Sequence, residues 1–170
     1  MLLSPVNLEH YNLKRLDIET IDAYQPAVAG IYPNFDHASF SAQVDVSEVT
    51  GENIPNPPAY QITLNLVGEP KSENSFPYRF NIGAVGFFSF RGHETGGARD
   101  DMVSMSGCAM LYSTLREVLL GLTIRFPHGP ILLPTVSFMD MRKNSTATVA
   151  PSTTNSTPKR PRKASTRTVK

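Results

Sequence analysis

The chain has 170 residues, a length that permits one folded domain whose core needs neither disulfides nor metals. The single cysteine, Cys108, cannot form an internal disulfide, and residues 1–5 contain neither the charged nor the apolar region of a secretory signal. No apolar run approaches the roughly 20 residues that a membrane span needs. We therefore expect a cytoplasmic protein that inserts into no membrane.

The net charge of +1 hides two segments of opposite charge. Residues 142–170 contain eight basic residues and no acidic ones, whereas residues 1–141 contain 8 basic and 15 acidic residues. The two segments therefore carry +8 and −7. Because residues 142–170 are rich in Ser, Thr and Pro and have little to bury, they are predicted to be a disordered basic tail. The folded domain is expected to span residues 1–141.

Four runs of alternating polarity predict strands. The first, residues 12–19, is only partly periodic and is expected at a sheet edge. Residues 38–49 alternate cleanly between apolar and polar side chains, and residues 60–66 repeat the pattern. Turn-forming residues at 68–75 then lead into an apolar run at 78–90, which predicts a hairpin.

From Asp101 to Phe126, apolar residues recur at spacings of three and four, which predicts one long amphipathic helix. Asp100, Asp101 or Ser104 is expected to cap its start, and Pro127 to end it. The predicted fold is thus α+β, a four-stranded antiparallel sheet followed by one long helix. The helix carries more apolar surface than one sheet face covers, so we expect self-association or, alternatively, a bulky core.

Two further segments, residues 21–35 and 127–139, are rich in apolar side chains but have no regular period. Their prolines favour extended conformations and leave backbone groups without helical partners. Both segments are therefore predicted to be loops.

The residue types that carry catalysis or bind metals are scattered along the chain. The glycine-rich residues 92–101 lack the Lys-Ser/Thr ending of a phosphate-binding loop. Cys108 lies on the apolar stripe of the predicted helix, where cysteine usually acts as a small hydrophobe. The histidines show no metal-ligand spacing and fall in separate turns and loops: His10, His37, His93 and His128. We predict a protein that is not an enzyme and that uses no metal or cofactor.

Three motifs, in this order along the chain, resemble the SecB family of protein-export chaperones. Residues 78–90, with small residues before Gly-Phe-Phe-Ser-Phe, look like the last strand of that family. Residues 111–120 contain Arg116 and Glu117 and are similar to the family's long helix, as is the Phe-Pro pair beyond them. Residues 133–138, Leu-Pro-Thr-Val-Ser-Phe, resemble the family's Leu-Pro-Pro-Val-Asn-Phe loop.

The resemblance implies an ATP-independent holdase that binds unfolded or precursor polypeptides in apolar grooves and keeps them competent for export. The implied groove residues are Tyr24, Ile31, Tyr32, Phe35, Ile131, Leu132, Leu133, Val136, Phe138 and Met139. The alternative for each is that it closes over the protein's own core. The resemblance also implies a homo-oligomer, a dimer of dimers. Its interface is expected at Phe80, Ile82, Ala84, Met105, Tyr112, Leu120 and Ile124.

Two departures from the family concern the partner. The family has an acidic tail that docks onto the motor SecA, whereas this tail is basic. Arg79 and Asn81 also occupy the strand face where the family offers acid, although Asp17 still fits that pattern. These departures argue against SecA as the translocation motor. The first alternative is a SecB-like chaperone of a toxin–antitoxin system. Others are an assembly protein, or weak nucleic-acid binding through the tail.

Overall fold

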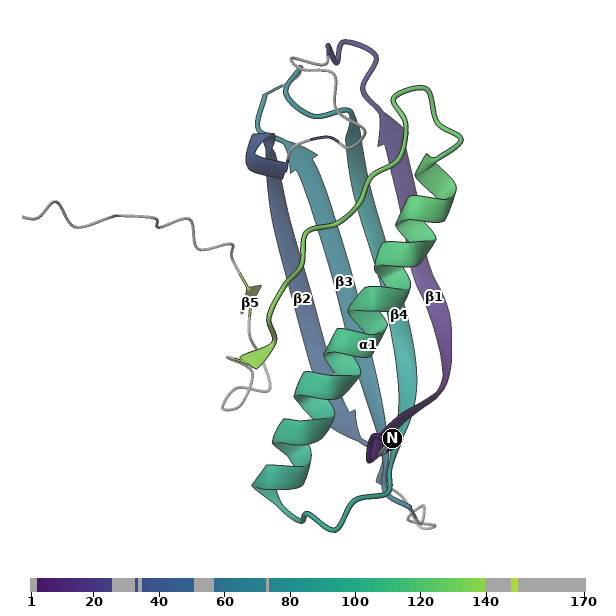
Figure 1. Cartoon of the computed structure of the whole chain (residues 1–170), viewed down its shortest axis with the longest axis vertical. Coiled ribbons are helices and arrows are strands. Elements are labelled where there is room, and N and C mark those ends of the chain that lie inside the picture. Colours follow the sequence, from purple (N-terminus) through teal and green to yellow (C-terminus); the bar gives the residue numbers. More distant parts are fainter. Residues whose placement is uncertain are drawn as a thin grey trace, which may run out of the picture.

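The computed structural model describes residues 3–25, 33, 35–50, 57–72, 74–139 and 148–149. Four long strands form one antiparallel sheet, and a single long helix crosses one face of it (Figure 1). The elements are β1 (Val6–Thr20), η1 (Phe35–His37), β2 (Ala38–Glu48), β3 (Ala59–Pro70), β4 (Tyr78–Phe90), α1 (Gly97–Thr123) and β5 (Thr148–Val149). Sheet order is β1-β4-β3-β2-β5, so the predicted α+β fold and the edge position of the first strand are confirmed.

Alternation along the strands builds the core. The apolar residues of β3 that face α1 are at most 3% exposed, and the residues between them are only half-buried. These core positions are Tyr60, Ile62, Leu64 and Leu66. The predicted hairpin is also confirmed, because β3 and β4 pair antiparallel from Ala59↔Ser89 to Gly68↔Phe80.

The helix begins one turn earlier than the sequence predicts. Its N-cap is Gly96, with a φ of 58°, and no side chain caps it, so the predicted cap at Asp100, Asp101 or Ser104 was wrong. Glycine adopts a positive φ at little energetic cost. The chain therefore turns at Gly96, and the helix starts before those polar residues. Asp100 instead lies in the first turn and accepts a hydrogen bond from the Tyr60 hydroxyl at 3.1 Å.

Small residues let α1 approach the sheet closely. A Cβ placed on Gly107 would lie 2.3 Å from Cδ1 of Ile62, so a side chain at this position would have to displace the end of the Ile62 side chain. The neighbouring Cys108 is fully buried, which confirms its predicted place in the core. Burial raises the pKa of its thiol to about 12, and Cys108 is therefore protonated at neutral pH.

Two negative findings apply to the described residues only. No helix there combines the length and the apolar character needed to cross a membrane. No group of three or more His, Cys, Asp or Glu side chains there is placed to hold a metal ion.

Candidate functional site

Residues 130–139, which we call the strap, follow α1 and run beside it across the same face of the sheet (Figure 1). Three of the predicted groove residues, Ile131, Leu133 and Phe138, point into the core and are 0%, 1% and 7% exposed. In the protomer these three side chains support the surface and leave almost no area for a client to touch. Leu132 and Val136 are half-buried, and Met139 is 56% exposed.

Contacts to α1 fix the strap at both ends. The backbone N–H of Ile131 donates to Oγ1 of Thr123 at 2.9 Å. The Tyr112 hydroxyl donates to the carbonyl of Pro134, and the Phe138 ring packs edge-on against Tyr112 with centroids 5.8 Å apart. Burial raises the pKa of Tyr112 to about 12, which keeps this hydroxyl a donor over the physiological range.

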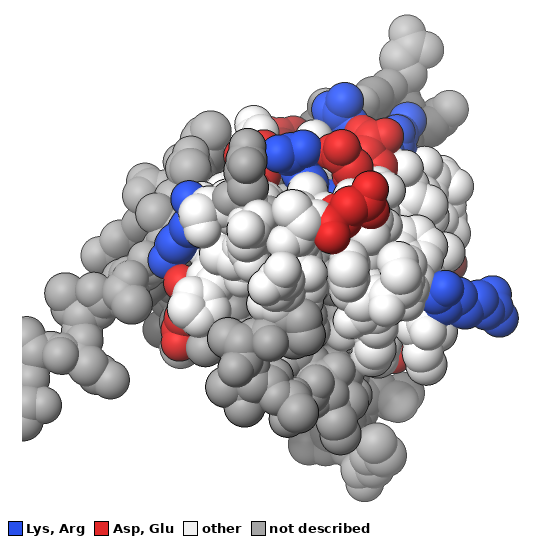
Figure 2. Space-filling view, turned by 90° about the horizontal axis from the view of Figure 1, so that it is seen from above, with Lys and Arg blue, Asp and Glu red and all other residues white. Residues whose placement is uncertain are grey.

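The structure brings Tyr24, from the first predicted groove wall, against the loop after α1. Its ring lies edge-on to His128 at 5.3 Å, and His128 is 5.9 Å from the Tyr78 ring. The Tyr78 hydroxyl donates to the Gly129 carbonyl at 2.7 Å and so ties the loop to β4. Figure 2 looks onto this end of the molecule, where uncharged residues occupy the middle of the described surface and many of the charged side chains gather toward its rim.

Phe35 belongs to a different aromatic group. It packs against Phe76 at 4.9 Å and against Phe40 at 6.3 Å, and it is half-buried. The other two residues of this predicted wall, Ile31 and Tyr32, lie outside the described residues. The two described members of this wall therefore lie in different places: Tyr24 is beside the loop after α1, and Phe35 is beside β2.

The predicted interface residues divide into two groups. Phe80, Ile82 and Ala84 are at most 1% exposed in the core, and Tyr112, which contacts the strap, is 4% exposed, so these side chains have almost no area left for a second subunit. Three residues on α1 and at its end keep accessible surface: Met105 and Leu120 are half-buried, and Ile124 is 61% exposed.

The sequence did not predict an exposed row of apolar side chains on β1. Tyr11, Leu13 and Leu16 are 39%, 42% and 44% exposed, although they oppose residues of β4 that face α1. Irregular pairing between Leu8 and His10, and again between Leu13 and Arg15, shifts the alternation and brings all three onto one face. We call this row the β1 strip. Spacings of two and three would have suggested a bulged strand.

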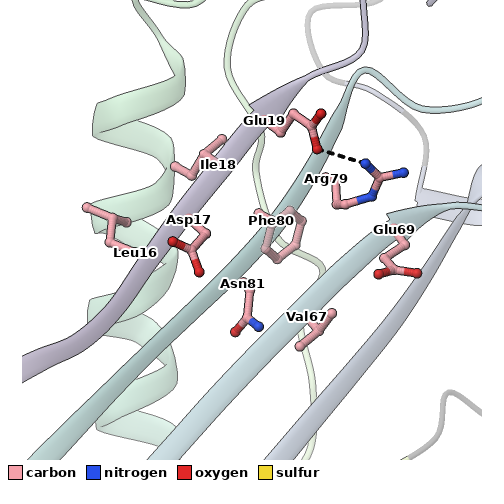
Figure 3. Close-up of a pocket in the computed structure, with 9 residues that line it drawn as sticks. All are labelled: Leu16, Asp17, Ile18, Glu19, Val67, Glu69, Arg79, Phe80 and Asn81. Carbon is pink, nitrogen blue, oxygen red and sulfur yellow. Dashed lines mark hydrogen bonds and ion pairs between the residues drawn. The ribbon is translucent and has the colours of Figure 1, made fainter.

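The opposite face of the sheet carries charged and polar side chains at one end. A shallow depression near the ends of β1 and β4 contains Asp17, Glu19, Glu69, Arg79 and Asn81 (Figure 3). Arg79 Nη1 lies 2.7 Å from Glu19 Oε2, and Asp17 pairs with Asn81 in the strand register. The predicted shared face of Asp17, Arg79 and Asn81 is confirmed. The two charges are half-exposed, so their pairing contributes little stability.

Comparisons with known proteins do not assign the chain to a family. No family model matches the chain, and no curated protein matches it. A solved structure that resembles it is the SecB-like chaperone Rv1957 of Mycobacterium tuberculosis, in complex with a ChAD peptide from the antitoxin HigA1. The two chains share 12% identity with a TM-score of 0.48 over 78% of this chain and 91% of that chain. Similarity this low establishes neither a family nor a function.

Proposed function

We propose that the protein is an ATP-independent holdase chaperone that binds unfolded polypeptides. The observation that carries the proposal is that apolar side chains stay exposed although the core is already packed. The core residues of β3 are at most 3% exposed, yet Met139 on the strap and the β1 strip stay accessible. Exposed apolar side chains on both flanks of α1 favour interaction sites there, and apolar surfaces bind many sequences because desolvation requires no particular partner.

The client site is proposed on the outward side of the strap and the adjoining aromatic residues. Its described members are Tyr24, Phe35, Leu132, Val136 and Met139, and Ile31 and Tyr32 are expected to extend it. Fully burying an exposed apolar side chain is worth about 1.5–3 kcal/mol, and the half-buried members of this site would each add roughly half of that. Several of them along an extended client therefore suffice for a holdase, and the buried Ile131, Leu133 and Phe138 keep the surface in place.

Self-association is proposed on the other flank of α1. The β1 strip lies on an edge strand, and an exposed edge with an apolar row readily pairs with another chain. Ile124, at the end of α1, adds a further 61%-exposed apolar side chain. We propose that a second copy covers the β1 strip and that Met105, Leu120 and Ile124 extend the interface. A dimer of dimers is the expected assembly.

Delivery to an export motor and protection of an antitoxin are both compatible with such a holdase. On the polar face, Arg79 forms an ion pair with Glu19. Because of this pair, that face carries less negative charge than the SecB family offers to SecA there. It favours an antitoxin-type client over export, and client identity then distinguishes the two roles.

The test is aggregation of several unrelated unfolded proteins, followed by light scattering without nucleotide. The Val136→Ser/Met139→Ser variant should require about thirtyfold more protein for equal protection, because each substitution removes on the order of 1 kcal/mol of apolar contact. The Thr135→Ala/Ser137→Ala variant, altered at neighbouring exposed positions, should behave as wild type.

Three outcomes of this experiment would each change the function proposed for this surface. Wild-type protein that protects no client would end the holdase proposal. Protection of a single folded partner would identify an assembly protein. Equal protection by both double variants would move the client site away from the strap.

A further inference from the structure

The free edge of β2 has the geometry of a strand acceptor. β2 pairs with β3 along its whole length, from Ala38↔Pro70 to Glu48↔Tyr60. On its other side, among the described residues, only Ala42 and Gln43 have strand partners. An edge of this kind presents backbone N–H and C=O groups that an extended segment can pair with.

The two faces of β2 differ in a way that suits an apolar segment. Phe40 and Val46 are half-buried on the face shared with α1, where Ala42 and Val44 are buried. The alternate side chains, such as Ser41 and Gln43, are exposed and polar. A segment added at this edge would therefore gain apolar contacts on one face and keep the other in water.

The chain's own tail provides the occupant. β5 pairs antiparallel with β2 through Ala42↔Val149 and Gln43↔Thr148. Thr148 and Val149 are β-branched, and β-branched residues favour strands. Pro151 follows two residues later and has no N–H to donate, so the pairing must stop near it.

Tethering and charge both favour this pairing. Only residues 140–147 separate the strap from β5 along the chain, and a tether of so few residues holds its end at an effective concentration on the order of millimolar. Residues 142–170 carry +8 and residues 1–141 carry −7, so the two parts also attract each other at low ionic strength.

We propose that the β2 edge is a strand-addition site for extended polypeptides and that the tail segment around Thr148 and Val149 occupies it in cis. Clients would then bind by displacing the tail. This inference rests on the proposed holdase function and adds to it a binding mode, backbone pairing beside the apolar strap, together with a built-in competitor.

Pairing of the tail is tested first, without any client. In the full-length chain, Gln43→Cys combined with Thr148→Cys places two cysteines at directly opposed strand positions, where Cα atoms are about 4.5–5.5 Å apart, a separation that a disulfide can span under mild oxidation. Gln43→Cys with Thr154→Cys is the control. Cys108 is fully buried and protonated, so it will not compete. The first pair should form an intramolecular disulfide at least about tenfold faster, because strand pairing holds only those two positions opposite each other.

Competition is tested next with a short, uncharged, Thr- and Val-rich fluorescent peptide, by anisotropy. The oxidised Gln43→Cys/Thr148→Cys chain should bind it at least about tenfold more weakly, and dithiothreitol should restore binding. Thr148→Pro/Val149→Pro should bind the peptide about three- to tenfold more tightly than wild type, because the competing hydrogen bonds are lost. Thr153→Pro/Thr154→Pro, equal in proline content and charge, should match wild type.

Several results would overturn the inference. Equal crosslinking rates would show that the tail does not pair at Gln43. A disulfide-linked dimer would place the tail on a second copy. Preferential crosslinking with unchanged peptide binding would show that the β2 edge is no acceptor for clients. A wild-type chain that neither binds the peptide nor protects any client counts against the proposed function. The crosslink then still decides, on its own, whether the tail pairs.

Discussion

Similar apolar side chains lie on both flanks of α1, but they are buried to different extents. On one flank the strap buries Leu133 to 1% exposure, whereas on the other flank Leu13 and Leu16 of β1 remain 42% and 44% exposed (Figure 1). The strap is drawn down by hydrogen bonds to Thr123 and Tyr112. β1 pairs with β4 and also contacts α1, but the helix leaves this row of side chains partly uncovered. Here the extent of burial depends more on the hydrogen bonds that hold a segment in place than on how apolar the segment is.

The largest effect is expected from the same substitution made on each flank. Leu133→Ala should lower the free energy of unfolding by about 2–5 kcal/mol, because it opens a cavity in a packed core. Leu16→Ala should cost under about 1 kcal/mol, since its side chain is already half in water. Urea denaturation at low protein concentration measures both.

Leu132→Ala is the matched control for the strap, since this neighbouring leucine is half-buried. Its cost should lie between the other two. Similar losses for Leu133→Ala and Leu16→Ala would contradict the distinction between a closed and an open flank.

A smaller effect is expected from the anchor of the strap. Tyr112→Phe removes the hydrogen bond to Pro134 and should cost about 1 kcal/mol near neutral pH. Burial raises the folded-state pKa of Tyr112 from 10.0 to about 12, so its contribution is fully present below about pH 10 and is lost as the pH rises toward 12. Denaturation between pH 8 and pH 12 should therefore show a shallower decline in the variant. Parallel declines would mean that the Tyr112 hydroxyl is not buried as described.

The smallest effect on stability is expected on the β1 strip, where assembly should change instead. Leu13→Glu/Leu16→Glu should alter the free energy of unfolding of the protomer by under about 1 kcal/mol and should shift the native mass toward the monomer. Lys14→Glu changes the net charge by the same amount at an exposed position between them and should leave the oligomer intact. An unchanged native mass in both variants would place the interface elsewhere.

Much of the fold could be predicted because polarity alternates along it. The run at residues 78–90 matches β4 residue for residue, and the run at 38–49 exceeds β2 by one. The helix start was missed because the left-handed conformation of Gly96 is invisible among several glycines and acids. The β1 strip was missed because two pairing irregularities break the period that a strand prediction looks for.

The candidate site was harder to predict than the fold. Ile131, Leu132 and Leu133 are consecutive and equally apolar, so nothing in their order tells which of them points inward. The choice depends on Thr123 and Tyr112, which lie 8 and 22 residues away along the chain from the groups that they bind. Phe80, Ile82 and Ala84 were likewise visible as one apolar face, but not as the face that α1 itself covers.

The sequence by itself determined the strands, the helix and the division into an acidic body and a basic tail, because period and charge are local properties of the chain. Only the tertiary structure decided which apolar side chains stay exposed. That outcome depends on contacts between segments far apart in sequence: the strap against α1, β1 against β4, and β5 against β2. Composition alone cannot encode such contacts.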